Sequence, residues 1–464
     1  MVQGTSSSAG KSLITTALAR AMHRRGIDVA PFKAQNMSNN ARAVNGGEIG
    51  TAQYLQALAA GVEPDVLMNP VLVKPEGDDR SQVVILGQPD LELSRMPWRS
   101  RSPLLWPVIE RSLRRLQAEH DLLLLEGAGS PAETNLREAD LANMRTAAAA
   151  GARVVLVADI DRGGAFAHLY GTWAMLPDGE RAMIAGFVLN KFRGDPALLP
   201  PAPEHLERLT GVRTLGVLPW LRHGLPDEDG AATPLDSHRR CSVAVVRYPT
   251  ASNLDEFKQL EQVADVRWTN RAEDVEHSDF VVLPGSKHVA ADIAWLVSTG
   301  IDEALKRRAG AGRPLLGICG GLQMLGQRIE DEADVDGSGD GLGLLPLRTT
   351  FTAAKHTDRV STCFQPLSGP WAVLSGSSFA GYQIRHGRSI TTAAVCEALP
   401  GGLGFINGSV LGVYVHGLFE EPGILMALFH DRPRRTLDQA FDELADAIEA
   451  HLDVPHLLRE AGIR

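Results

Sequence analysis

Apolar residues near the start of the chain recur at spacings of three and four. This period predicts an amphipathic helix that carries Leu13, Ile14, Ala17, Leu18, Ala21 and Met22, with Gly26 placed to end it. Further along, uninterrupted apolar runs at 28–32, 122–125, 154–158 and 184–189 predict short strands. Such runs between helical segments are typical of a parallel sheet with helices on both faces.

A second series of the same kind follows a break in composition. Residues 219–240 are rich in Pro, Gly, Asp and Glu, which favours a connection between domains. Apolar runs at 243–248, 280–283, 314–318 and 410–415 then predict a second sheet. We therefore expect an α/β fold with two doubly wound, mostly parallel-sheet domains. The expected divisions are a first domain over 1–225, a linker over 226–240, a second domain over 241–434, and a helical tail over 435–464 with helices at 437–452 and 455–461.

Composition and charge narrow the class of protein. The 464 residues are 44% hydrophobic and 22% charged, which is ordinary for a globular chain. A net charge of −10 argues against a general nucleic-acid binder. Four cysteines, the closest pair 33 residues apart, form no CxxC motif and fit a reducing compartment. Without a long apolar run or a signal-like start, we expect a cytoplasmic protein with no membrane partner.

The first candidate site is the glycine-rich segment Gly4–Ser12, which opens the first helix. Backbone N–H groups around Gly4, Thr5 and Gly10 could converge on phosphate oxygens, Lys11 could neutralise phosphate charge, and the Ser12 hydroxyl could ligate Mg²⁺. Five residues separate the first glycine from the Gly-Lys pair, where the strict phosphate-loop pattern has four. A simple turn before a surface helix is the alternative. The first strand, Met1–Gln3, is short and leaves open a start upstream.

Four further residues fit a nucleotide site at the edge of the first sheet. Lys33 ends a strand and could reach phosphates, and Asn190 follows the run 184–189 as a candidate nucleotide contact. Glu126 follows the run 122–125 and precedes Gly127, where a carboxylate could hold a metal ion or its water. Glu48 is a candidate second acid, since Mg²⁺ prefers one or two carboxylates together with phosphates. Each could instead be an ordinary surface or capping residue.

The second candidate site centres on Cys319, within Gly317-Ile318-Cys319-Gly320-Gly321. The segment follows a strand and opens a helix expected over 322–329, so it has the pattern of a nucleophile elbow. The N–H groups of Gly320 and Gly285 could stabilise an oxyanion, and His416 at the end of the run 410–415 could transfer protons. A small buried core residue and a structural histidine are the alternatives.

Three stretches carry a resemblance to a known family. They are Pro31-Phe-Lys-Ala-Gln-Asn-Met-Ser-Asn-Asn40, Glu126-Gly-Ala-Gly-Ser-Pro-Ala-Glu133 and Asp159-Ile-Asp-Arg-Gly-Gly164. With the Cys319 segment, they make nearly the whole chain resemble the cobyric acid synthase family of cobalamin biosynthesis. The resemblance implies a P-loop NTPase-like domain of the dethiobiotin synthetase type, followed by a class I glutamine amidotransferase domain of the cobyrinate type.

The resemblance also implies the chemistry. Cys319 would attack glutamine and His416 would act as its acid and base. ATP and Mg²⁺ would phosphorylate carboxylates b, d, e and g of adenosylcobyrinic acid a,c-diamide, and ammonia would displace the phosphate. The small-molecule partners would thus be glutamine, ATP and that corrinoid.

Some positions depart from the family pattern. Ordinary triad amidotransferases carry Glu two residues after the histidine, where this chain has Leu418; Glu420 and Glu421 are the nearest acids along the chain. Ser8 stands where the family often has Asp, and Gln383 and Arg385 stand where it often has Glu and His.

Three alternatives remain open. The a,c-diamide synthases usually carry Gly-Pro-Asp after the lysine, where this chain has Ala-Gln-Asn. A ParA/MinD-like ATPase would use the phosphate loop but would not need Cys319. A scaffold with an inactive second domain is the third.

Overall fold

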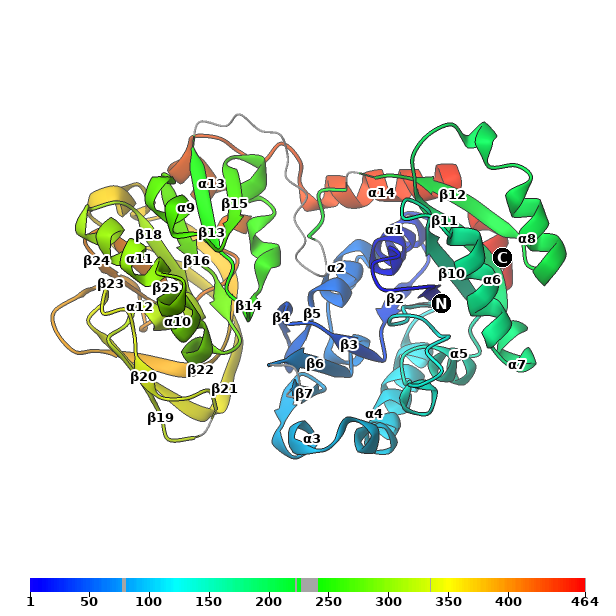
Figure 1. The fold of residues 1–464 in the computed structure, drawn as a ribbon, viewed down its shortest axis with the longest axis horizontal. Helices are drawn as coiled ribbons and strands as arrows, with labels where there is room; N and C mark the ends of the chain where they lie inside the picture. The colour runs from blue at the N-terminus through cyan, green and yellow to red at the C-terminus, as the bar shows by residue number, and fades with distance from the viewer. Residues whose placement is uncertain (77–80, 222, 227–240, 334, 464) are drawn as a thin grey trace.

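A computed structural model describes residues 1–76, 81–221, 223–226, 241–333 and 335–463. Two α/β bodies lie side by side (Figure 1). The first body comprises residues 1–226 and the last two helices, and the second body comprises residues 241–429. The linker was expected at residues 226–240, and its residues 227–240 lie outside the described residues. Within the described residues, no helix is both long and apolar enough to cross a bilayer.

A parallel sheet forms the centre of the first body. Its strands are β1 (Val2–Gly4), β2 (Val29–Phe32), β9 (Leu122–Leu125), β10 (Val154–Asp159), β11 (Ile184–Phe192) and β12 (Thr214–Pro219). Strands β1, β10, β11 and β12 pair in that order, and a bridge between Val2 and Glu126 places the β2–β9 pair beside β1. Alternate residues of β10 face opposite helical layers, with Val155 and Val157 on one side and Leu156 on the other. Burial on both faces explains the continuous apolar run.

Helices cover both faces of this sheet. The helices in this part of the chain are α1 (Lys11–Arg24), α2 (Thr51–Ala60), α3 (Leu91–Arg95), α4 (Trp98–Glu119), α5 (Met144–Ala150), α6 (Ala165–Met175), α7 (Asp178–Arg181) and α8 (Ala202–Thr210). Of these, α3 packs against the strand β7 (Ser81–Ile85). A small sheet and a hairpin extend the body toward its neighbour: β3 (Gln35–Met37), β6 (Val71–Pro75), β7 (Ser81–Ile85) and β8 (Gln88–Asp90), and the pair β4 (Ala41–Val44) and β5 (Gly47–Gly50).

The chain returns to the first body at its C-terminus. Helix α14 (Leu437–His451) lies beside α1, as Figure 1 shows, and α15 (Val454–Glu460) follows it. Phe441, Leu444 and Ile448 join the same apolar cluster as the buried face of α1. The helical tail expected at 435–464 therefore completes the core of the first body.

A seven-stranded sheet forms the centre of the second body. In order across the sheet its strands are β15 (Asp265–Thr269), β13 (Ser242–Val246), β16 (Phe280–Leu283), β18 (Leu315–Ile318), β25 (Val410–Val413), β24 (Gly404–Asn407) and β23 (Cys396–Leu399). The first five strands run parallel, and β24 pairs antiparallel with both β25 and β23. The helices are α9 (Ala272–His277), α10 (Val289–Ser298), α11 (Ile301–Gly310), α12 (Gly320–Leu325) and α13 (Pro422–Phe429).

A long hairpin stands beside this sheet. It is formed by β21 (Leu347–Cys363) and β22 (Ser378–Thr391), with β19 (Arg328–Asp331) and β20 (Gly339–Asp340) on its edge. The sequence prediction of a helix over 322–329 is wrong at its end, because α12 stops at Leu325 before Gly326 and Arg328 already begins β19. The pair β14 (Ala251–Ser252) and β17 (Gly285–Ser286) connects two loops at the carboxyl edge of the main sheet.

Candidate active sites

Cys319 lies at a sharp turn between β18 and α12. Its backbone has φ 52° and ψ −104°, a conformation that non-glycine residues rarely adopt and that tight catalytic turns impose. The flanking glycines are required by close packing: a Cβ on Gly317 would lie 2.6 Å from the carbonyl oxygen of Gly321, and one on Gly320 would lie 2.6 Å from the Ser286 amide nitrogen. The turn is therefore built as the elbow that the sequence pattern predicts.

His416 and Glu256 stand next to this cysteine. The imidazole of His416 hydrogen-bonds to the Cys319 sulfur, and its Nδ1 lies 2.8 Å from Glu256 Oε1. The other carboxylate oxygen of Glu256 accepts the N–H of Gly417 at 2.9 Å, so its position is fixed from two sides. Burial alone would lower the pKa of His416, but the Glu256 carboxylate and the Cys319 sulfur raise it to about 10. The arrangement is a Cys–His–Glu triad.

Nothing in the sequence pattern identified Glu256 as the third member of this triad. It lies on the short helical segment Leu254–Phe257, 160 residues before His416. The nearer acids have other contacts: Glu420 binds Arg42, and the Glu421 side chain accepts the N–H of Gly423 at the start of α13. No local spacing connects Glu256 to His416, and only the return of the chain to one sheet edge brings them together.

The two candidate oxyanion residues border the same site. A Cβ on Gly285 would lie 3.0 Å from His416 Cε1, and β17 sets Gly285 opposite Ser252 of β14. Gly320 directly follows Cys319 and packs against Ser286. The structure thus brings Gly285, Gly320, Cys319 and His416 together, as the sequence predicts. The Cys319 sulfur also lies 3.6 Å from the carbonyl oxygen of Ile384 on β22.

The glycine-rich segment of the first body joins β1 to α1. Lys11 Nζ donates to the carbonyl oxygens of Ser6 at 3.0 Å and Gly129 at 3.2 Å, so its ammonium lies inside the loop. Gly10 has φ +100°, and a Cβ there would lie 2.0 Å from Asn190 Nδ2, which donates to the Ala9 carbonyl. Asn190 therefore holds the loop as well as lying beside it.

Two more of the candidate residues belong to this loop. Gly4 ends β1, where a Cβ would lie 3.1 Å from Lys11 Nζ. The Thr5 N–H donates to the Val157 carbonyl, while the buried Thr5 hydroxyl has no hydrogen-bond partner among the residues that the structure describes. A buried hydroxyl of this kind fits a phosphate oxygen that approaches the loop.

Glu126 is the centre of a buried polar cluster beside this loop. Its Oε1 accepts from Ser12 Oγ at 2.8 Å and from Lys33 Nζ at 2.7 Å, and its Oε2 accepts from Gln56 Nε2 at 2.6 Å. A hydroxyl and a carboxylate together are hard oxygen ligands, and they fit an Mg²⁺ ion whose remaining ligands are phosphates and water. Lys33 pairs with this carboxylate directly. The strand-end position of Glu126 predicted this placement; the sequence did not indicate Gln56.

Glu48 does not join Ser12 and Glu126, so its prediction as a second metal ligand is not supported by its contacts. Its carboxylate is fully buried between Lys74, whose Nζ lies 2.5 Å from Oε2, and Lys355 of the second body. Burial raises the pKa of Glu48, but the two ammonium groups outweigh this and lower it to about 2. Both oxygens are thus occupied by lysines at the junction of the two bodies.

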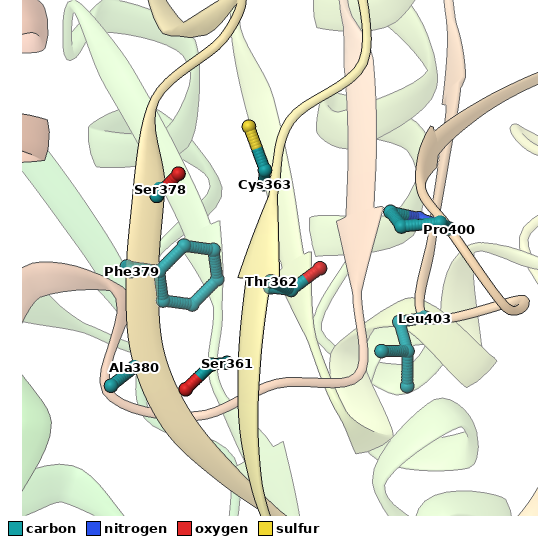
Figure 2. Close-up of a pocket in the computed structure, with 8 residues that line it drawn as sticks. All are labelled: Ser361, Thr362, Cys363, Ser378, Phe379, Ala380, Pro400 and Leu403. Carbon is teal, nitrogen blue, oxygen red and sulfur yellow. The ribbon is translucent and has the colours of Figure 1, made fainter.

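A surface hollow of about 650 Å³ lies elsewhere on the second body (Figure 2). It is lined by Ser361, Thr362, Cys363, Ser378, Phe379, Ala380, Pro400 and Leu403. None of these residues belongs to either candidate site, and the Cys363 thiol has no histidine among the lining residues. The hollow therefore does not mark the chemistry.

Comparison with known proteins gives matches to both bodies. The CobQ/CobB/MinD/ParA nucleotide binding domain matches residues 1–224, and the CobB/CobQ-like glutamine amidotransferase domain matches residues 242–423. Proteins named cobyric acid synthase are similar over 98% of this chain. The one from Polaromonas sp. (strain JS666 / ATCC BAA-500) is 51% identical with 96% of its own length covered, and that from Paracidovorax citrulli (strain AAC00-1) is 54% identical with 96% covered. The similarity spans both bodies.

Proposed function

Because the chain belongs to the cobyric acid synthase family, we propose that it amidates carboxylates b, d, e and g of adenosylcobyrinic acid a,c-diamide, using ATP and glutamine. The observation that carries this proposal is the presence of two complementary sites on one chain. The second body holds a Cys–His–Glu triad that can release ammonia, and the first body holds a phosphate loop beside a buried carboxylate.

Glutamine hydrolysis would take place at Cys319. The sulfur attacks the side-chain carboxamide carbon of glutamine, and the N–H groups of Gly320 and Gly285 stabilise the oxyanion. His416 donates a proton to the departing nitrogen, so ammonia leaves and a glutamyl thioester remains. His416 then takes a proton from water, which cleaves the thioester and releases glutamate. Glu256 holds the imidazole through Nδ1 during both steps.

Carboxylate activation would take place at the phosphate loop. A carboxylate resists amidation because its leaving group would be oxide, and an acyl phosphate supplies a better one. Lys11 would neutralise charge on the phosphates, while the loop N–H groups orient them. Mg²⁺, held by Ser12 and Glu126, would offset the charge that develops during transfer. Ammonia then displaces phosphate, so each amidation uses one ATP and one glutamine and yields ADP, phosphate and glutamate.

Two variants separate the sites. Cys319→Ala is expected to lose amidation with glutamine and to keep amidation with an ammonium salt. Lys11→Ala is expected to lose amidation with either nitrogen source. Mass spectrometry of the corrinoid product counts the hydroxyl-to-amine replacements and identifies the substrate class. Full glutamine-dependent turnover in Cys319→Ala, or an unchanged corrinoid with the wild-type enzyme, would contradict the proposal.

A further inference from the structure

Arg42 of the first body is inserted between two carboxylates of the second body. It lies on β4, which packs against β21 and β22, and its side chain is 6% exposed. Its Nε lies 2.7 Å from Asp255 Oδ2, its Nη1 lies 3.0 Å from Glu420 Oε2, and its Nη2 contacts both carboxylates. Asp255 directly precedes Glu256, and Glu420 lies four residues after His416. The guanidinium therefore connects the two segments that carry the triad's acid and base.

A second contact leads from Arg42 to the imidazole itself. The guanidinium carbon lies 4.9 Å from the ring centre of Tyr382, within the range of a cation–π interaction. The same Tyr382 ring also stacks on the imidazole of His416, with ring centres 5.2 Å apart and an angle of 20° between the ring planes. Tyr382 and His416 also exchange backbone hydrogen bonds. Arg42 thus fixes the ring against which His416 rests.

The backbone of β4 adds a third contact beside Arg42. Asn253 Nδ2 donates to the Ala41 carbonyl at 2.6 Å and to the Tyr382 hydroxyl at 2.9 Å. The N–H of Leu254 donates to Asn40 Oδ1 at 3.1 Å. The segment that carries Glu256 is therefore held at its start by the first body.

From these contacts we propose that Arg42 is a positioning residue of the glutaminase site, supplied to the second body by the first. The proposal rests on the proposed function, in which Cys319, His416 and Glu256 hydrolyse glutamine. The carboxylates of Asp255 and Glu420 bind the Arg42 guanidinium, and the carboxylate of Glu256 binds the His416 imidazole. Removing Arg42 would leave the buried Asp255 charge uncompensated, since its Oδ2 is held by Arg42 and its Oδ1 has no partner in the described residues.

The consequence is a dependence of glutamine hydrolysis on contact between the two bodies. Without the guanidinium, the segment carrying Glu256 and the Tyr382 ring lose their shared support, and the imidazole is less well oriented toward the sulfur. Misplacement of a catalytic group by about 1 Å costs on the order of 10²-fold in rate. The binding of glutamine is not expected to weaken along with the rate of hydrolysis, because Arg42 has no contact with Cys319 or Gly285 among the described residues.

The test compares Arg42→Ala with Arg359→Ala in the full-length protein. Arg359 also joins the two bodies, through Glu63 at 2.6 Å and the Ala43 carbonyl at 3.4 Å, but it is half-exposed and far less constrained. Glutamate release and ammonium-driven amidation are measured for both. Arg42→Ala is expected to lower kcat for glutamine on the order of 10²-fold, with KM changed little and ammonium-driven amidation retained. Arg359→Ala is expected to stay within about 2-fold for both reactions.

Two further measurements distinguish an orienting role of Arg42 from a general weakening of the contact between the two bodies. Added guanidinium ions are expected to restore part of the activity of Arg42→Ala, and Arg42→Lys is expected to be intermediate, because an ammonium cannot bind both carboxylates with a planar fork. Alkylation of Cys319 by iodoacetamide should be slower in Arg42→Ala than in the wild-type protein, because the imidazole is less well oriented toward the sulfur. The rate of alkylation should be unchanged in Arg359→Ala.

Two results would overturn the inference. One is wild-type kcat in Arg42→Ala; the other is an equal loss of glutamine-driven and ammonium-driven activity. If Cys319→Ala abolishes glutamine use while Arg42→Ala does not, only this inference fails. If Cys319→Ala keeps glutamine use, the proposed function fails first.

Discussion

Replacement of Glu256 by Gln tests the triad most directly. The substitution keeps the size of the side chain but removes the charge that faces His416 Nδ1 across 2.8 Å. In the wild-type protein the pKa of His416 is raised from 6.5 to about 10, which corresponds to about 5 kcal/mol in favour of the imidazolium. The Glu256 carboxylate makes the larger of the two favourable contributions, and the Cys319 sulfur makes the other.

Because a correctly oriented and protonated acid–base group contributes about 10²-fold or more, loss of this carboxylate predicts a decrease of about 10²-fold in kcat/KM for glutamine. The sign of the pH dependence also follows. Without the Glu256 carboxylate, the pKa of His416 falls below its wild-type value of about 10, so the imidazolium that protonates the leaving nitrogen is lost at a lower pH than in the wild-type protein. The ratio of Glu256→Gln activity to wild-type activity should therefore fall as the pH rises from about 6 toward about 10.

The assay measures glutamate released in the presence of ATP and corrinoid, with ammonium-driven amidation as the check on folding. Glu421→Gln is the matched control, because Glu421 also follows the His416 loop but only caps α13. It should retain nearly full activity. Equal activity in both variants would refute the assignment of Glu256, and so would a loss of Glu256→Gln activity that does not vary with pH.

Two other substitutions test the first body. Gly10→Ala places a methyl group 2.0 Å from Asn190 Nδ2 at a φ of +100°, so ammonium-driven amidation should fall about 10-fold or more while glutamate release persists; unchanged ATP kinetics would contradict this. Glu48→Gln leaves two buried lysines without their carboxylate and should cost about 3–5 kcal/mol of stability, seen as a lower Tm at neutral pH. Because the pKa of Glu48 is lowered from 4.5 to about 2, its contribution is full above about pH 4.5 and is lost as the pH falls toward 2. A Tm difference that stays constant over that range would show that the ion pairs are not its source.

Local patterns were sufficient for the catalytic turn and the phosphate loop. The glycines around Cys319 are needed because neighbouring backbone lies within 2.6 Å of where their side chains would begin, and such a requirement is written in the sequence itself. In the same way, Glu126 follows an apolar run that becomes β9, and β9 lies next to β1, where the phosphate loop starts. A residue at the carboxyl end of a central parallel strand is placed by topology alone.

The partners of buried charges could not be predicted in this way. Glu48 and Glu126 both follow short strands or turns, but Glu48 lies on the hairpin β4–β5 and turns toward Lys355 instead of toward Ser12. No local sequence pattern marked Glu256 as a catalytic residue, because its partner His416 lies in a loop 160 residues later in the chain. The tail beginning at Leu437 was predicted to be helical, but the sequence did not identify α1 as the helix against which it packs.

These unpredicted contacts have a common consequence for the molecule as a whole. Glu48 pairs with Lys355 and Arg42 with Asp255 across the junction of the two bodies, and all four side chains are nearly or fully buried. The chain then returns through α14 to complete the apolar core of the first body. A cut within residues 227–240 would therefore not yield two independent units, since the first body would lack a helix of its core and each body would expose unpaired charges. The body that carries the Cys319 triad and the body that carries the Gly4–Ser12 loop are thus joined by these buried ion pairs.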